Sequence, residues 1–175
     1  MRTLLTSALC LLALQTGCSQ DLKWSAVNQM IASDFPDVPT LTTDALAERL
    51  ADSTATSPLL LDARSPEEYA VSHLPGARRV APSADSIAGL DTLSRERPIV
   101  VYCSVGYRSA RVTAHLRDQG FSNVHNLKGS IFRWANEGRS VMRGDTSVQA
   151  VHPYNSTWGT LLHDSLHCRT PGACA

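Results

Sequence analysis

The sequence has no excess charge of either sign, no long apolar run beyond its N-terminus and no Cys-X-X-Cys pair. Its 16 basic residues balance its 16 acidic residues, so no net field recruits nucleic acid or an anionic membrane surface. Without a Cys-X-X-Cys pair, a resolving thiol for a redox role would have to come from the C-terminal tail or from a partner. There is no internal repeat and no low-complexity tract. With 175 residues, of which 43% are hydrophobic, the chain is long enough for one ordinary folded domain.

The N-terminus carries the one long apolar run. Arg2 precedes an almost unbroken apolar stretch over residues 4–14, and small residues follow it. This order is typical of a secretory signal peptide. The stretch is too short to span a bilayer comfortably, which weakens the alternative of a membrane anchor helix. We therefore expect residues 1–17 to be a cleaved signal peptide and the protein to be exported.

Cys18 offers a second interpretation of the same cleavage site. Gly17-Cys18 resembles the end of a bacterial lipobox, in which the cysteine is acylated and becomes the new N-terminus. The match is incomplete, because Gln15 stands where the motif prefers leucine. The sequence leaves open a lipoprotein anchored at Cys18 and a periplasmic protein released by ordinary cleavage. A membrane is then contacted only through the lipid.

Two further cysteines lie near the C-terminus. Cys168 and Cys174 flank a short segment that contains Pro-Gly. In an oxidising compartment, we expect this pair to form a disulfide that closes a small turn. His163 and His167 have the i, i+4 spacing of metal ligands, but scattered histidines in a tail are more often solvated, and we expect no metal site.

Cys103 stands where a short apolar run ends and a helical pattern begins. The run Ile99–Tyr102 precedes it, and a helix-like segment follows over residues 109–119. The first N–H groups of a helix lack internal partners, and the helix dipole adds partial positive charge there. Both effects lower the pKa of a nearby thiol, and Arg108 adds a fixed positive charge. The sequence therefore predicts covalent sulfur or anion chemistry at Cys103; an inert buried thiol is the alternative.

Short apolar runs alternate with helical patterns along the rest of the chain, which predicts a parallel sheet with helices on both faces. Ser65, Pro66 and Glu68 form a capping box that starts one of the helices. Cys103 then lies at the carboxyl end of a strand, where such sheets bind ligands. We expect strands at residues 59–62, 78–81, 99–102 and 124–127, and helical segments at residues 24–31, 43–50, 66–70, 87–93, 109–119 and 131–137.

Three stretches of the sequence resemble, in order, the motifs of rhodanese domains. LLDARSPEEYAVSHLPGA (residues 60–77) resembles the N-terminal signature of the family, and VVYCSVGYRS (residues 100–109) resembles its active-site loop. LKGSIFRW (residues 127–134) resembles the stretch that follows, although Ser130 stands where a second glycine is common. Three motifs in order are far more specific than any one of them.

This resemblance implies both a fold and a chemistry. The fold is α/β, a rhodanese-like five-stranded parallel sheet flanked by helices on both faces. In the chemistry, Cys103 takes sulfane sulfur from a donor such as thiosulfate, becomes a persulfide, and passes the sulfur to a thiophilic acceptor such as cyanide. No metal or organic cofactor is implied, and the expected ligands are a small sulfur donor and acceptor.

The loop after Cys103 suits this chemistry. Its backbone N–H groups can stabilise the charged outer sulfur of a persulfide, as an oxyanion hole does. Gly106 allows a tight, left-handed turn, and Arg108 can hold the oxyanion end of thiosulfate. Tyr107 is expected to shape the mouth of the pocket. The substrate-binding residues that we expect are Ser104, Val105, Gly106, Tyr107, Arg108 and Ser109.

Other residues of the motifs are expected to be structural. Asp62 and Arg64 stand at a strand end, where an ion pair is a simpler role than proton transfer. His73 stands beside a Pro-Gly turn and should bond to backbone groups, and Trp134 should pack in the core.

The sequence patterns described above predict four parts of the chain. Trp158, Leu161 and Leu162 indicate that the last part packs back on the domain. The parts are a signal peptide at residues 1–17, a lead-in at residues 18–37, a rhodanese-like domain at residues 38–145 and a C-terminal extension at residues 146–175.

Two other functions stay open. A phosphatase of the cysteine–arginine type also uses a thiolate under a ring of N–H groups, but it has five residues between the two side chains, whereas four separate Cys103 from Arg108. A non-enzymatic redox or sulfur-relay module would instead use Cys103 with a partner protein. An exported thiol needs a dedicated donor or reductant, which favours this second alternative over the first.

Overall fold

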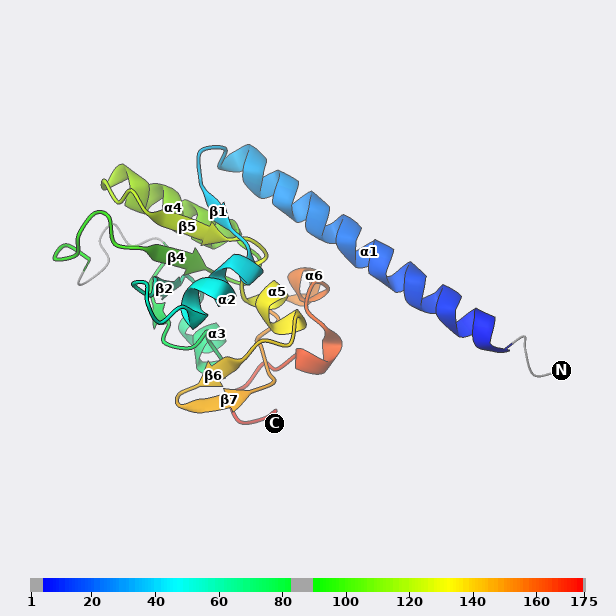
Figure 1. Cartoon of the computed structure of the whole chain (residues 1–175). Coiled ribbons are helices and arrows are strands. Elements are labelled where there is room, and N and C mark those ends of the chain that lie inside the picture. Colours follow the sequence, from blue (N-terminus) through cyan, green and yellow to red (C-terminus); the bar gives the residue numbers. More distant parts are fainter. Residues whose placement is uncertain (1–4, 83–89, 175) are drawn as a thin grey trace.

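The computed structural model describes residues 5–82 and 90–174, with side chains from Gln20 onward. The side chains of the expected signal peptide and of Cys18 lie outside the described residues. The helices are α1 (Leu5–Asp34), α2 (Thr43–Ala51), α3 (Pro66–Val71), α4 (Tyr107–Asp118), α5 (Ser130–Asn136), α6 (Ser156–Gly159) and the 3-10 helix η1 (Asp164–Leu166). The strands are β1 (Thr40–Leu41), β2 (Leu59–Asp62), β3 (Arg78–Arg79), β4 (Ile99–Tyr102), β5 (Val124–Leu127), β6 (Val141–Arg143) and β7 (Thr146–Val148). Helices and strands alternate from α1 to β3 and from β4 to β6, as the sequence predicts, whereas β3 and β4, and β6 and β7, follow each other with no described helix between them (Figure 1).

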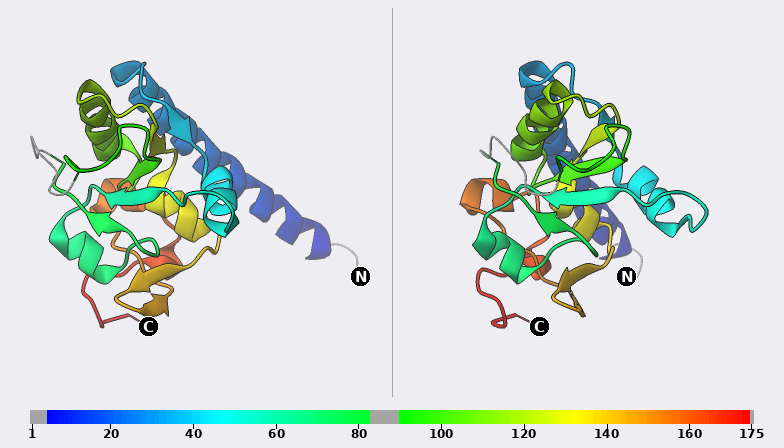
Figure 2. Two further views of the ribbon diagram at one scale, coloured as in Figure 1. Left: turned by 60° about the vertical axis from the view of Figure 1, so that its left-hand side comes forward. Right: turned by 90° about the vertical axis from the view of Figure 1, so that its left-hand side faces the viewer.

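Five strands form one parallel sheet in the order β1-β5-β4-β2-β3. This sheet, with helices on both faces, confirms the predicted α/β fold (Figures 1 and 2). All four residues of the central strand β4 are buried, which is typical of a strand covered on both faces. The chain leaves β4 at Cys103, so this residue lies at the carboxyl edge of the middle strand.

Two hydrophobic clusters fill the space on either side of β4. Val100 and Tyr102 belong to the cluster that includes residues of α1, α2 and α5. Val101 belongs to the other cluster, with Val112 and Leu116 of α4. Successive residues of β4 thus contribute to opposite faces of the sheet, because side chains alternate between the two faces along a strand.

The lead-in expected at residues 18–37 is part of the core. Trp24, Val27 and Ile31 are buried at helical spacing on α1, as the sequence predicts. The C-terminal part of α1 therefore packs against the domain. Within the described part of the chain, no helix combines the length and the apolar character needed to cross a bilayer.

Some elements differ from the sequence prediction. β1 has only two residues, which is too short for any periodicity to show. β6 and β7 pair as an antiparallel hairpin across the expected domain boundary at residue 145, so that boundary falls inside a paired unit. Of the expected helix at residues 87–93, residues 87–89 lie outside the described residues. Residues 90–93 are described and form a turn instead of a helix, in which the Leu93 N–H donates to the Leu90 carbonyl at 3.0 Å.

The C-terminal extension packs back on the domain, as expected. Leu161 and Leu162 are buried. The Asn136 side chain, at the end of α5, donates to the Leu161 carbonyl at 2.8 Å and accepts from the His163 N–H at 2.9 Å. The extension is therefore held by side-chain packing and by hydrogen bonds to the helix that follows the last strand of the sheet.

A disulfide joins Cys168 and Cys174, which is the pairing expected from the sequence. Cys168 is also tied to the start of the extension, because its N–H donates to the Val151 carbonyl at 3.0 Å. The Val151 N–H in turn donates to the Leu166 carbonyl at 2.7 Å. The two ends of the extension are thus fastened to each other.

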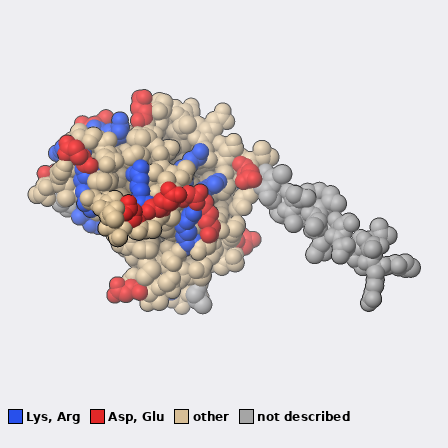
Figure 3. All heavy atoms as spheres, viewed as in Figure 1, with Lys and Arg blue, Asp and Glu red and all other residues tan. Residues whose placement is uncertain are grey.

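Acidic and basic side chains are interspersed on the face shown in Figure 3. A band of acidic side chains crosses the middle of this face, and basic side chains lie beside it.

Candidate active site

Cys103 is buried beneath the first turn of α4, with 1% of its surface exposed. α4 begins at Tyr107, two residues before the predicted start. The Gly106 N–H, just before that helix, donates to the Cys103 sulfur at 3.2 Å. The Cys103 N–H itself donates to the Ser130 hydroxyl at 3.1 Å. The thiol therefore faces backbone donors at a helix start, as the sequence predicts.

Burial and positive charge act on the Cys103 thiol in opposite directions. Burial alone raises the pKa of a thiol, because it disfavours the charged form. The Arg108 guanidinium and hydrogen bonds from Ser109 and Gly106 outweigh burial and hold the pKa of Cys103 below its ordinary value. The residue is therefore suited to react as a thiolate.

Arg108 has a partner that the sequence did not reveal. Its guanidinium forms a two-pronged ion pair with Glu68, with Nη1–Oε2 at 2.7 Å and Nη2–Oε1 at 2.8 Å. It also donates to the Ser104 hydroxyl at 3.0 Å. Three of its N–H donors are thus engaged by protein groups, while the side chain still lines the pocket that contains Cys103. That Arg108 holds the thiosulfate oxyanion stays a prediction, and its charge also acts on Cys103 through space.

Glu68 joins the α3 cap to the active-site loop. It accepts from the Ser65 N–H at 3.0 Å, which completes the predicted capping box. It also accepts from the Ser104 hydroxyl at 2.8 Å. Burial would raise its pKa, but the Arg108 guanidinium and these hydrogen bonds lower the pKa of Glu68 to about 2. The sequence motif showed only the cap, and the link to the loop requires the tertiary fold.

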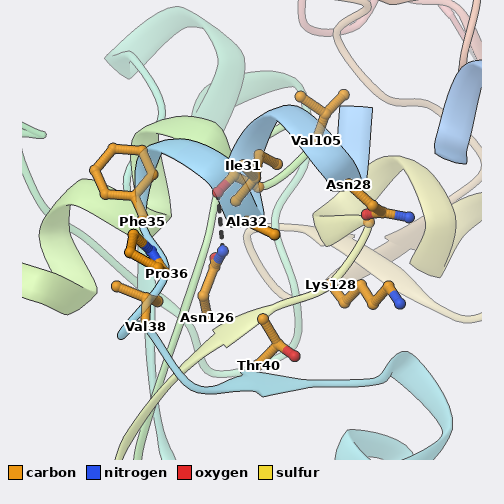
Figure 4. Close-up of a pocket in the computed structure, with 12 residues that line it drawn as sticks. Asn28, Ile31, Ala32, Phe35, Pro36, Val38, Thr40, Val105, Asn126 and Lys128 are labelled. Atoms are coloured by element: carbon orange, nitrogen blue, oxygen red, sulfur yellow. Dashed lines mark hydrogen bonds between the residues drawn. The ribbon is translucent and has the colours of Figure 1, made fainter. Parts of the chain in front are cut away.

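Asn126 fixes the back of the loop. Its side-chain amide donates to the Gly106 carbonyl at 2.9 Å (Figure 4), and its carbonyl accepts from the Ser109 hydroxyl at 2.7 Å. Gly106 has φ +117°, and a Cβ there would lie 3.2 Å from the Ile31 side chain. Glycine is thus required both by the backbone conformation and by the close approach of α1. A buried asparagine within an apolar strand was the sequence signal for this role.

Two pockets lie on either side of the loop. The one behind it, shown in Figure 4, has a volume of about 240 Å³ and lies between α1 and the β1–β5 edge of the sheet. The one in front, also about 240 Å³, contains Cys103. Two of the expected substrate-binding residues lie elsewhere than in the wall of the front pocket. Gly106 lines the rear pocket, and Ser109 is buried. The front pocket is lined by Met30, Cys103, Ser104, Val105, Tyr107, Arg108, Tyr154 and Trp158.

The front pocket brings together most of the predicted loop residues and three that were not predicted. Tyr107 lies in its wall, as expected. Met30 reaches it from α1, and Tyr154 and Trp158 reach it from the C-terminal extension. No local motif marks these three residues, because their place depends on how the two ends of the chain fold over the sheet.

The residues expected to be structural have structural partners. The Arg64 guanidinium donates to the Asp62 carboxylate, with Nε–Oδ1 at 2.9 Å and Nη2–Oδ2 at 2.7 Å, and both side chains are fully buried. The His73 ring lies 3.2 Å from the Tyr69 carbonyl. Trp134 is buried in the core and donates to a backbone carbonyl at 2.9 Å.

The sequence model of the rhodanese-like domain family matches residues 42–137. The chain is 34% identical over 99 residues to a sulfurtransferase of Allochromatium vinosum, a match that covers 57% of this chain and 90% of that protein. It is 38% identical over 90 residues to the thiosulfate sulfurtransferase GlpE of Pseudomonas aeruginosa, covering 50% of this chain and 76% of that protein.

Solved structures resemble the chain in the same way. A rhodanese-like domain protein from Staphylococcus aureus aligns with a TM-score of 0.50 at 27% identity, over 58% of this chain and 95% of that one. The BH2092 protein from Bacillus halodurans aligns with a TM-score of 0.58 at 21% identity, over 78% of this chain and 97% of that one, which bears on the fold alone.

Proposed function

Because the chain belongs to the rhodanese-like domain family, we propose that it is a sulfurtransferase whose Cys103 carries sulfane sulfur as a persulfide. The observation that carries the proposal is the state of the Cys103 sulfur. It is buried at the carboxyl end of β4, lies 3.2 Å from the Gly106 N–H, and has a lowered pKa. The relatives named as sulfurtransferases support the same chemistry.

The proposed reaction has two displacement steps. The Cys103 thiolate attacks the outer sulfur of a donor such as thiosulfate, the donor S–S bond breaks, and sulfite leaves with the bonding pair. A thiophilic acceptor such as cyanide then attacks the outer sulfur of the persulfide and leaves as thiocyanate, which restores the thiolate. No oxidant or reductant is consumed, because the sulfur atom moves without a net change of electrons.

The protein groups stabilise the charged sulfur in both steps. The Gly106 N–H already bonds to the Cys103 sulfur, and the N-terminal end of α4 offers further unpaired donors to an added sulfur atom. The Arg108–Glu68 pair keeps positive charge close to the loop, and Arg108 also donates to Ser104 within it.

The test is turnover of thiosulfate and cyanide to thiocyanate, with Cys103→Ser as the comparison. We expect the variant to fall to the uncatalysed background, and peptide mass mapping to find one added sulfur atom on Cys103 of the native chain after thiosulfate alone. Turnover that survives in Cys103→Ser would contradict the proposal. A persulfide that forms but is not passed to cyanide would favour the sulfur-relay role with a partner protein, and release of phosphate from an aryl phosphate would favour a phosphatase.

Export is a proposal that rests on the N-terminal sequence pattern. We propose that residues 1–17 are removed and that the protein is either released into the periplasm or held at a membrane by a lipid on Cys18. Expression of the full chain and of Cys18→Ala in a bacterial host separates the two. A membrane fraction that loses the protein on Cys18→Ala supports lipidation, whereas equal soluble periplasmic yield of both supports ordinary cleavage.

A further inference from the structure

The wall of the Cys103 pocket is built partly from outside the family domain. The family match covers residues 42–137, whereas Met30 belongs to α1, and Tyr154 and Trp158 belong to the C-terminal extension. The reacting sulfur therefore comes from the part that the family match covers, and part of the pocket wall comes from segments outside that match.

This pocket is close to neutral and mostly apolar or aromatic. Among the described residues that line it, Arg108 is the one positively charged side chain. The buried Glu68 carboxylate pairs with it through both oxygens, and the Tyr154 ring covers the guanidinium at 4.7 Å. A small dianion such as thiosulfate thus meets a cation that is already paired and covered, whereas an apolar body meets Met30 and Trp158.

Tyr154 is held in a conformation that costs free energy. Its φ is +63°, in the left-handed region that a bulky residue rarely adopts. The Tyr154 N–H donates to His152 Nδ1 at 3.0 Å, and the Trp158 N–H donates to the Asn155 side chain at 2.9 Å. Backbone strain of this kind persists where the surroundings enforce it, often at ligand sites.

The extension is fastened firmly enough to hold these rings in place. The Cys168–Cys174 disulfide and the backbone bonds between Val151 and Cys168 close it on itself. The Ser72 hydroxyl, after α3, donates to the Ala150 carbonyl at 2.5 Å and ties it to the domain. The two aromatic side chains are therefore held in the wall of the Cys103 pocket before any substrate binds.

We propose that the sulfur carrier which this pocket selects is a small organic thiol, or its persulfide, with an apolar or aromatic body, and that Tyr154 and Trp158 determine this specificity. This inference rests on the proposed sulfurtransferase function. The volume of about 240 Å³ is below the range of about 300–1,000 Å³ usual for drug-sized ligands, so the body is no larger than a single ring or a short chain.

The transfer step balances without a further reagent. As a donor, the organic persulfide is attacked by the Cys103 thiolate at its outer sulfur, its S–S bond breaks, and the organic thiolate leaves with the bonding pair. As an acceptor, an organic thiolate attacks the outer sulfur of the Cys103 persulfide and leaves as an organic persulfide, which regenerates the Cys103 thiolate.

The experiment compares two thiol acceptors of similar basicity, benzyl mercaptan and 2-mercaptoethanol. The full chain is loaded with sulfur from thiosulfate, and loss of sulfur from Cys103 is followed by mass spectrometry after rapid quenching. We expect the native protein to favour benzyl mercaptan by about tenfold or more in second-order rate constant. Trp158→Ala and Tyr154→Gly, the latter compatible with a positive φ, should remove most of that preference, and Trp158→Phe should keep it.

Leu22→Ala is the control, because Leu22 is an exposed apolar residue of α1 with 72% of its surface accessible, and it should not change the preference. Equal rates for the two thiols, or a preference that Trp158→Ala leaves intact, would overturn the inference while the sulfurtransferase function stands. Failure of thiosulfate to load Cys103 of the native chain would overturn both.

Discussion

At the residue scale, the reactivity of Cys103 depends on the positive charge of Arg108, which Glu68 holds in place. Arg108 lowers the pKa of the thiol against the effect of burial, and Glu68 fixes the guanidinium through two bonds. The reactive residue thus lies directly after β4, its electrostatic partner lies on α4, and the anchor of that partner lies on α3.

Replacing Arg108 tests this arrangement. Arg108→Gln removes the positive charge and leaves the Glu68 carboxylate near the loop, so both effects should raise the pKa of Cys103. The pH dependence of alkylation at Cys103, followed by peptide mapping, measures the shift. Arg108→Lys is the matched control, because it keeps the charge while losing the two-pronged geometry, and its shift should be smaller. An unchanged alkylation profile in Arg108→Gln would show that Arg108 has no electrostatic role.

A second prediction concerns Gly106. Alanine at this position combines a φ of +117° with a Cβ only 3.2 Å from Ile31, so it should displace the N–H that bonds to the Cys103 sulfur. We expect kcat/KM for thiosulfate and cyanide to fall by about tenfold or more. Gly120→Ala is the control, since Gly120 also has a positive φ but open space around its Cα. A similar loss in both variants would indicate general destabilisation instead of a change at the sulfur.

The sequence predicts the site only where the relevant residues are local. Cys103, the loop that follows it and the cap at Ser65 share short segments with recognisable spacing. Glu68 was visible as a capping residue, but its bond to Arg108 spans 40 positions of the chain. Tyr154 carries no motif at all, because its relation to Cys103 exists only after the extension has folded back.

At the element scale, β2 ends in a buried ion pair that holds the chain where it turns toward α3. The Arg64 guanidinium donates to Asp62 and to the Ser72 carbonyl, and so joins the two ends of that helix segment. Both charged side chains are fully buried. Removing one partner of such a pair leaves an uncompensated charge in the interior.

We predict that Arg64→Met destabilises the domain by about 3–5 kcal/mol. The measurement is urea unfolding followed by tryptophan fluorescence. The double variant Asp62→Leu, Arg64→Met removes both charges and should recover part of the loss. A double variant no more stable than Arg64→Met would show that packing of the arginine side chain, and not the unpaired charge, dominates.

Helices and strands that are long and have a clear hydrophobic pattern are predicted from the sequence better than short elements without such a pattern. β2 and β4 are mainly apolar runs, and β5 begins and ends with an apolar residue; each lies where the sequence predicts. β1 has no such pattern, since its two residues form a strand only because β5 offers an edge to pair with. The β6–β7 hairpin was missed for a related reason, because each strand has only three residues and only Val141 among them is buried.

At the scale of the whole molecule, acid should weaken the fold through Glu68. Its pKa is about 2 in the folded protein and has an ordinary value of 4.5. Because the folded pKa is the lower of the two, the unfolded chain takes up the proton first as the pH falls. The contribution of Glu68, up to about 3 kcal/mol, is therefore complete above about pH 4.5 and is lost as the pH falls toward 2.

Urea unfolding at pH 7 and pH 3 checks this linkage. The difference between the two pH values should be smaller in Glu68→Gln than in the native protein, whereas the exposed Glu48→Gln should retain the native difference. An equal difference in all three proteins would mean that the acid sensitivity arises from other groups.

The order of the strands also bears on when the molecule can fold. β1 pairs with β5, so the first strand of the sheet has no partner until the chain has been made through Leu127. Pairings between such distant segments close long loops and form slowly. In a nascent chain that has not reached Leu127, β1 therefore has no partner strand. Tyr154 and Trp158, which supply part of the pocket wall, are synthesised later still. The fold is therefore completed late in synthesis, and most of the chain has been made before the five-stranded sheet can form in full.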